Sequence, residues 1–334
     1  MSPRATFRKI ITSEALTAKI NKQNIKLMKQ FLKEKSIRTS TKTIKVYESN
    51  ILIFMTWNLL HNNNKLFTDI KKIEFSDFFY FASEEMRLGS SRLNNLRSTL
   101  SSLSNFIEKF MDEEYPDFRN VILKVVDSAP KELRREKAIL TDEQIESLLE
   151  HLRVTDTQKA CWLALAVTSG ARFSELLLFE ADLIDENKTA FDGLFLETTR
   201  EIKTKGRGRS GKMLYKYVLR DKFLPFFRAW MIDRHNLLTS RGIANNRLFL
   251  RSDGNPATNS TVRGWVSEFE AYLAVPLYTH ALRHFLVTLL SRKNIPYNLI
   301  QAIFGWESSE MVKVYDDSTI KDKSFPELEN LRDI

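Results

Sequence analysis

The stretch TSGARFSELL, residues 168–177, combines a helix-breaking glycine with a pair of opposite charges. Gly170 permits a sharp break in the backbone before a new helix, because glycine has no Cβ to restrict its dihedral angles. Arg172 and Glu175 are three residues apart, so on that helix they share a face and can form an ion pair. By itself such a pair is usually a surface salt bridge. The stretch therefore indicates a function only in combination with the motifs that lie further along the chain.

A second polar motif lies in THALRHFLVTLL, residues 279–290. On a helix, His280 and Arg283 project from the same face. A single His-x-x-Arg pair is a weak signal, because it arises by chance in many chains. For the neighbouring His284 we expect a structural histidine held by hydrogen bonds.

Two further features complete the set. GWESSEMVKVY, residues 305–315, has Tyr315 nine residues after Trp306, on a helix that Ser308 can cap. Residues 193–199 and 213–219 are typical of two strands, and KTKGRGRSGK, residues 203–212, is typical of a basic, glycine-rich hairpin tip between them. Taken singly, these features also fit a half-buried tyrosine and a solvated loop.

The first 125 residues contain apolar side chains at helical spacing. The four runs are Ile25, Met28 and Leu32; Ile44, Tyr47, Ile51 and Phe54; Phe75, Phe78, Phe79 and Ala82; and Leu93, Leu96, Leu100, Leu103, Ile107 and Phe110. This pattern predicts four helices in a small bundle.

Breaks in the pattern predict the domain boundaries. Pro130 and the charged residues after it indicate a linker at 131–137, between a helical domain at 20–130 and a second domain at 138–318. A basic segment, 1–19, precedes these domains, and a tail, 319–334, follows them. In the tail, Phe325, Leu328 and Leu331 form a short apolar edge that can dock either on its own domain or on a neighbouring protomer.

The second domain mixes helices with short strands. A capping-box pattern at Thr141 starts a predicted helix at 141–152, and a second helix is expected at 157–168. Leu248 to Leu250 is expected to form a third short strand, and helices continue to about residue 315.

The charge of the chain is concentrated near its N-terminus. Lys and Arg total 51 against 42 acidic residues, and residues 1–135 hold 24 basic and 15 acidic side chains, whereas the remainder holds 27 of each. This bias fits a polyanion such as nucleic acid or an anionic membrane surface, and it fits solvated helix faces equally well. The single cysteine, Cys161, excludes an internal disulfide and a Cys-based zinc site, and no apolar run is long enough for a membrane span.

The order and spacing of the four features resemble the tyrosine recombinase family, the phage-integrase-like site-specific DNA recombinases. TSGARFSELL resembles that family's first box, an arginine with an acid three residues later. THALRHFLVTLL resembles its second box, and GWESSEMVKVY its third, in which Gly-His or Gly-Trp precedes the nucleophilic tyrosine by nine residues. The basic hairpin falls where the family keeps its catalytic lysine.

The resemblance extends over most of the chain and implies a fold. Residues 20–125 resemble the family's helical core-binding domain. The expected fold is mainly α, with a helical (SAM-like) core-binding domain followed by a mixed α+β catalytic domain with a small sheet. The chain departs from the commonest pattern at Trp306, where histidine is more usual, and at Met311-Val312, where a threonine pair is frequent. Neither departure removes a catalytic group.

The resemblance implies a role for each polar residue, and the residue types suit the chemistry. Tyr315 would attack phosphorus and conserve the bond energy as a phosphotyrosine ester. Arg172 and Arg283 would each donate two hydrogen bonds to the non-bridging oxygens, in place of a metal clamp, so no metal and no cofactor are expected. The acid for the leaving 5′ oxygen would be Lys205, with Lys203 as the alternative and Lys212 as a third lysine on the same hairpin.

The remaining residues would support these groups. His280 would assist proton transfer from the tyrosine or bind a phosphate oxygen. Trp306 would donate its indole N–H to a phosphate oxygen, and Glu175 would orient its neighbours.

By the same resemblance, the partners are double-stranded DNA recombination sites and a homo-tetramer assembled on two of them. Strands would be exchanged through a Holliday junction, with accessory DNA-bending or directionality proteins as further partners and the cytoplasm as location. Element integration, excision and dimer resolution all remain open as the biological role. Two other interpretations compete: a type IB topoisomerase-like enzyme that relaxes supercoils, and a non-catalytic DNA-binding protein that kept the fold.

Overall fold

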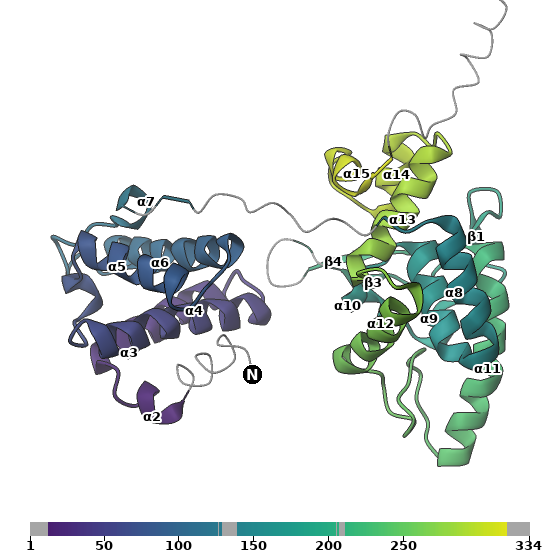
Figure 1. The fold of residues 1–334 in the computed structure, drawn as a ribbon, viewed down its shortest axis with the longest axis horizontal. Helices are drawn as coiled ribbons and strands as arrows, with labels where there is room; N and C mark the ends of the chain where they lie inside the picture. Colours follow the sequence, from purple (N-terminus) through teal and green to yellow (C-terminus); the bar gives the residue numbers. More distant parts are fainter. Residues whose placement is uncertain (1–12, 126, 129–138, 205, 207–210, 319–334) are drawn as a thin grey trace, which may run out of the picture. The chain divides into compact units, whose positions relative to one another are not determined.

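The computed structural model describes residues 13–125, 127–128, 139–204, 206 and 211–318. The chain divides into two compact units, which are described separately: the first comprises the described residues before 129, and the second nearly all of those from 139 on (Figure 1). Both units are built mainly from helices, and small sheets occur in the second, so the predicted fold class is confirmed. The linker at 131–137, the tail at 319–334 and residues 1–12 lie outside the described residues, and the domain boundaries stay predictions.

The first unit is a bundle of helices. Its four main helices are those predicted from the apolar runs: α3 (Lys22–Ser36), α4 (Thr41–His61), α5 (Lys72–Glu84) and α6 (Ser90–Phe110). Short elements accompany them: α2 (Glu14–Thr17), the 3-10 helix η1 (Phe67–Asp69) and α7 (Ile122–Val125). Phenylalanines fill the centre, where the ring of Phe54 packs against those of Phe67, Phe75 and Phe78.

Buried asparagines fix the loop that follows α4. The side chains of Asn24 and Asn58 each donate to the carbonyl of Lys65 at 2.8 Å. The backbone N–H of Phe67 donates to Asn24 Oδ1 at 2.8 Å. These bonds satisfy backbone groups that the phenylalanine core would otherwise leave unpaired.

The second unit is organised around one buried helix. The described helices are α8 (Asp142–Thr155), α9 (Thr157–Ser169), α10 (Phe173–Leu176), the 3-10 helix η2 (Ala181–Leu183), α11 (Arg220–Arg241), α12 (Asn259–Leu273), α13 (Thr279–Arg292), α14 (Tyr297–Phe304) and α15 (Glu310–Tyr315). Every residue of α9 from Ala160 to Ser169 is buried. α9 packs against α8, α11 and α13, so its C-terminal end lies deep in the unit.

Two small antiparallel sheets complete this unit. Three strands pair in the order β1-β2-β5, namely β1 (Thr189–Ala190), β2 (Phe195–Glu197) and β5 (Tyr217–Leu219). The other sheet is the hairpin of β3 (Ile202–Thr204) and β4 (Lys212–Leu214), in which Lys203 lies opposite Met213. The two arms of the predicted basic hairpin are therefore present, and residues 205 and 207–210 of its tip lie outside the described residues.

Three details differ from the sequence prediction. The strand expected at 213–219 is divided at residues 215–216 between β4 and β5, which belong to different sheets. Leu248–Leu250 is buried but forms no strand, since only isolated bridges occur at Arg247 and Leu250. The long helix α11 was not predicted, because Pro225 lies inside it and the charged Arg234 interrupts the buried face formed by Phe223, Leu224, Phe227 and Trp230. Within the described residues, each helix is too short or too polar to cross a membrane.

Candidate active site

The first box lies where α9 ends. Gly170 adopts the left-handed conformation with φ 55°, and a Cβ there would approach the ring of Phe304 to 2.4 Å. Both the backbone and the packing therefore require glycine. Two residues later, Arg172 is the N-cap of α10. The predicted break before a new helix is confirmed.

Arg172 and Glu175 form the predicted ion pair. Arg172 Nη1 lies 2.7 Å from Glu175 Oε1, and the backbone N–H of Arg172 donates to Oε2 at 2.9 Å. The carboxylate of Glu175 is 1% exposed, whereas the side chain of Arg172 is 22% exposed. The pair is thus no surface salt bridge, because its acidic member is buried and its basic member reaches toward solvent.

A lysine that the sequence analysis did not single out joins this pair. Lys216 lies between β4 and β5, is 4% exposed, and its Nζ is 3.0 Å from Glu175 Oε2. The two residues are 41 positions apart in the chain, so no local pattern connects them. Strand alternation places Lys216 on the same face as the buried Val218, which is the signal that could have revealed it.

Arg283, from the second box, is a buried guanidinium that the first box anchors. Its Nη1 donates to the carbonyl of Gly170 at 2.5 Å, and the residue is only 2% exposed. Its Nε and Nη2 are buried, and neither has a hydrogen-bond partner among the described residues. Since buried charged donors are normally paired, these two N–H groups are available for an anion.

Three aromatic rings lie along this guanidinium. Trp306 stacks on Phe304 at 4.7 Å and on Tyr315 at 5.3 Å, with interplanar angles of 19° and 18°. The guanidinium carbon of Arg283 is 4.7 Å, 4.8 Å and 5.2 Å from the ring centres of Phe304, Trp306 and Tyr315. The stack therefore brings the third box against the second, and the indole N–H of Trp306 is likewise buried without a partner.

The turn after Phe304 sets the position of Trp306. α14 ends at Gly305, which has φ 64°, and a Cβ there would meet Leu214 of β4 at 2.4 Å. The basic hairpin is thereby packed at its base against the third box. The N-cap of α15 is Ser309 rather than the predicted Ser308, although the Ser308 hydroxyl does accept from the backbone N–H of Glu310 at 3.2 Å.

The chain just after Tyr315 is tied to α13 and α14. Asp316 Oδ2 accepts from Ser291 Oγ at 2.5 Å and from the Tyr297 hydroxyl at 2.7 Å. His284 Nδ1 lies 2.7 Å from Asp317 Oδ2 and 3.1 Å from the carbonyl oxygen of Tyr315. His284 is thus the hydrogen-bonded histidine that we expected, and these contacts fix the C-terminal end of α15.

The electrostatics favour an anionic ligand. Burial opposes ionisation of Glu175, but Lys216 and Arg172 outweigh it and hold the pKa of that carboxyl below its ordinary value. Burial, partly offset by Glu175, lowers the pKa of Lys216. Burial and the charge of Arg172 lower the pKa of Arg283 to about 10, so this side chain is still a cation at neutral pH. Three cations surround one carboxylate, which leaves net positive charge for a phosphate.

The other predicted residues are either exposed or outside the described residues. His280 lies in the first turn of α13 and is exposed, one turn before the buried Arg283. Lys203 is exposed on β3, and its aliphatic chain runs over Gly211, while Lys212 is exposed on β4. Lys205 lies outside the described residues. Within the described ranges, no group of three or more His, Cys, Asp or Glu side chains is arranged to hold a metal ion.

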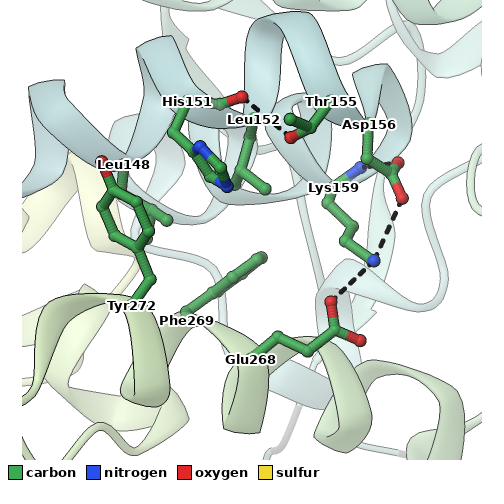
Figure 2. A pocket seen from close by; sticks show the side chains of 9 residues that line it. All are labelled: Leu148, His151, Leu152, Thr155, Asp156, Lys159, Glu268, Phe269 and Tyr272. Atoms are coloured by element: carbon green, nitrogen blue, oxygen red, sulfur yellow. Dashed lines mark hydrogen bonds and ion pairs between the residues drawn. The ribbon is translucent and has the colours of Figure 1, made fainter.

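A separate pocket of about 230 Å³ lies between α8, α9 and α12 (Figure 2). Lys159 bridges Asp156 and Glu268 at its edge, and His151 stacks on Tyr272 with ring centres 4.5 Å apart. None of the predicted site residues that the structure describes lines this pocket. It is thus distinct from the cluster around Arg283.

Comparison with known proteins agrees with this geometry. The model of the phage integrase family matches residues 138–321, more than half of the chain. A tyrosine recombinase of Thermosipho africanus is 23% identical, over 83% of this chain and 89% of its own length. Transposase B from transposon Tn554 of Staphylococcus aureus is 22% identical over 72% of this chain, which spans 38% of that protein.

Solved structures share the fold. The Tn1549 transposon integrase in complex with transposon right end DNA superposes with a TM-score of 0.63 at 17% identity, covering 92% of this chain and 99% of that one. The XerH site-specific recombinase bound to a palindromic difH substrate, a post-cleavage complex, gives 0.61 at 19% identity, covering 87% and 79%. With the family model matching the whole region that carries the three boxes, the chain belongs to the phage integrase family of tyrosine recombinases and is a site-specific DNA recombinase.

Proposed function

We propose that this recombinase cuts DNA by attack of Tyr315 on a phosphate held by Arg283 and Arg172, and rejoins it through a Holliday junction. The observation that carries the proposal is the stacking of Tyr315 on Trp306 beside a buried guanidinium with two unpartnered nitrogens. The tyrosine and a buried cation thus lie against each other.

Every bond and proton in the two steps is accounted for by the protein and the DNA. The phenolic oxygen of Tyr315 loses its proton and forms a bond to phosphorus, the bond from phosphorus to the 5′ oxygen breaks, and a 3′-phosphotyrosyl ester remains. The leaving 5′ oxygen takes up one proton and departs as a hydroxyl. In the second step a 5′ hydroxyl of the partner strand attacks this ester and releases Tyr315.

Each side chain near the phosphate has a role that its chemistry supports. Arg172 and Arg283 stabilise the charge that develops on the non-bridging oxygens, and the indole N–H of Trp306 donates to one of them. Lys205 supplies the proton to the 5′ oxygen, with Lys203 as the alternative on the same hairpin. His280 assists removal of the tyrosine proton.

The first unit offers a surface for the DNA backbone. Lys22, Lys26, Lys29 and Lys33 are all exposed, and their spacing puts them along one face of α3. The opposite face is buried through Leu27, Met28 and Phe31. A row of four lysines on one helix face suits the regularly spaced phosphates of a duplex, and we infer that α3 lies along the DNA.

Double-stranded recombination sites are therefore the inferred substrate, with four copies of the chain acting on two sites. Integration or excision of a mobile element and resolution of dimers are the two classes of reaction that this chemistry serves. Solved relatives of the same fold include an integrase bound to transposon end DNA and a recombinase bound to a difH substrate.

The test uses a pool of duplexes that carry a nick beside a randomised central segment. Cleavage next to the nick releases a short fragment, so the covalent complex cannot religate and survives denaturation. We expect the wild-type protein to form such an adduct in the presence of EDTA and to enrich one sequence. Tyr315→Phe should bind the enriched DNA and form no adduct, while the control Tyr272→Phe, on the exposed face of α12, should cleave normally.

The other interpretations give different results in the same assay. Adducts without sequence enrichment would favour a topoisomerase-like enzyme. Sequence-specific binding without any adduct would favour a DNA-binding protein that lost its chemistry. Loss of cleavage in EDTA would contradict a clamp made of arginines alone.

A further inference from the structure

Lys216 is an unusual residue to find in the interior. It is 4% exposed, and its backbone is fixed on both sides by the fully buried Thr198. The Lys216 N–H donates to Thr198 Oγ1 at 3.0 Å, and the Thr198 N–H donates to the Lys216 carbonyl at 3.0 Å. Burying an ammonium costs free energy unless an anionic partner compensates its charge.

That partner is Glu175, and Glu175 is the residue that holds Arg172. Oε1 of the carboxylate accepts from Arg172 Nη1, while Oε2 accepts both from the Arg172 backbone N–H and from Lys216 Nζ. Within the described part of the chain, Glu175 is the one polar partner of the Arg172 guanidinium. Lys216 can therefore act on Arg172 only through Glu175.

The charge of Lys216 has a second effect on the site. Without Lys216, the carboxylate of Glu175 would neutralise the charge of Arg172, and Arg283 alone would face the phosphate. Because Lys216 compensates the charge of Glu175, Arg172 keeps its positive charge and its remaining N–H groups for the DNA.

We propose that Lys216 is a positioning residue for DNA cleavage: it saturates Glu175, so that Arg172 is held in place and stays available to the scissile phosphate. This inference rests on the proposed function. It assigns no proton transfer to Lys216, whose Nζ is already engaged by Glu175 inside the protein. A positioning residue and a general acid make opposite predictions with modified substrates.

The test measures single-turnover adduct formation on the enriched nicked DNA, together with the dissociation constant of the same DNA. Lys216→Met should slow adduct formation about 100-fold, the size expected when a reacting group is misplaced. Its DNA affinity should stay close to that of the wild type. Lys216→Arg, which keeps a charged donor for Glu175, should recover most of the rate, whereas Lys216→Gln, which keeps only a neutral donor, should stay slow.

A matched control is Lys188, which also bonds to Thr198. Lys188 is half-buried and donates to the carbonyl of Thr198 at 2.7 Å, but it pairs with Glu197 rather than with Glu175. Lys188→Met should cleave at nearly the wild-type rate. If Lys216→Met does not fold, the comparison of Lys216→Arg with Lys216→Gln carries the same test.

Two modified substrates separate the roles. A methylphosphonate at the scissile position removes one negative charge and with it part of the need for Arg172, so Lys216→Met and wild type should approach one another in rate. A 5′-bridging sulfur needs no proton to leave, and it should not rescue Lys216→Met.

The result that would overturn the inference is also defined. Rescue of Lys216→Met by the bridging sulfur would make Lys216 the acid, and equal rates for Lys216→Met and Lys188→Met would leave it no role. In either case the wild-type protein still forms its adduct. If the wild-type protein forms none, the proposed function fails, and this outcome is distinct from failure of the positioning role.

Discussion

The two units bury different kinds of polar side chain. In the first unit, every buried polar side chain among the described residues is uncharged, and Asn24 and Asn58 use theirs to hold the backbone of a loop. In the second unit four charged side chains are buried: Glu175, Lys216, Arg234 and Arg283. Three of these four meet at the candidate active site.

The contrast separates stability from function. A buried amide that bonds a loop satisfies backbone groups and favours one fold. A buried guanidinium with unpartnered nitrogens costs free energy, and such groups are retained where a ligand pays the cost. Arg234 fits this distinction, because it donates to the carbonyls of Asn245 and Arg247 and lies away from the aromatic stack.

The largest effect is expected at Arg283. Arg283→Met keeps much of the side-chain volume and removes the charge, so adduct formation should fall at least about 1000-fold, the scale on which lost charge stabilisation acts. The free energy of unfolding should stay within about 1 kcal/mol of the wild type or rise, since the variant removes a buried charge that only the bond from Nη1 to the Gly170 carbonyl compensates. Chemical denaturation and single-turnover cleavage measure the two quantities. A strongly destabilised but active variant would break the contrast between the units.

Lys203 and Lys205 test whether a lysine of the basic segment 203–212 acts at the buried site. Lys205→Ala should slow cleavage about 100-fold, within the range of general acid catalysis, and a 5′-bridging sulfur should restore the rate. Lys203→Ala is the matched variant two residues earlier in the sequence, and it should cleave at nearly the wild-type rate. If Lys203→Ala is the slow and rescuable variant, the two assignments are exchanged.

The tail tests whether the second unit depends on a neighbour. If residues 321–334 dock on another protomer, their deletion should leave single-site binding intact and lower recombination about tenfold, since coupling between sites is commonly of this size. Gel-shift and recombination assays compare the two activities. Undiminished recombination would show that the tail docks on its own domain or has no such role.

The smallest effect on chemistry is expected in the first unit. Asn24→Ala removes the acceptor of the Phe67 N–H and should lower the free energy of unfolding by about 2 kcal/mol. Its cleavage rate below the melting temperature should equal that of the wild type. Gln23→Ala, next to it on the exposed face of α3, is the control for stability. Loss of cleavage in a folded Asn24→Ala protein would mean that the first unit takes part in the chemistry.

Local patterns predicted much of this molecule. The apolar runs predicted α3 to α6, and the first box predicted both the break at Gly170 and the pair of Arg172 with Glu175. These features depend on residues a few positions apart, which a sequence displays directly.

What the sequence could not reveal depends on contacts between distant segments. Lys216 reaches Glu175 across 41 positions, and the bond from Arg283 to the carbonyl of Gly170 spans 113. The predicted strand at Leu248–Leu250 was wrong because those leucines are buried by packing in the core rather than by strand pairing. α11 was missed because Pro225 and the buried Arg234 interrupt its apolar pattern.

The central claim is that the buried cations hold a DNA phosphate for attack by Tyr315. Mass spectrometry of the denatured adduct, after digestion of protein and DNA, tests it most directly. The account predicts a single modified peptide, with the 3′ phosphate of the cleaved strand esterified to the oxygen of Tyr315. A DNA fragment on any other residue, or a linkage through the 5′ phosphate, would contradict it.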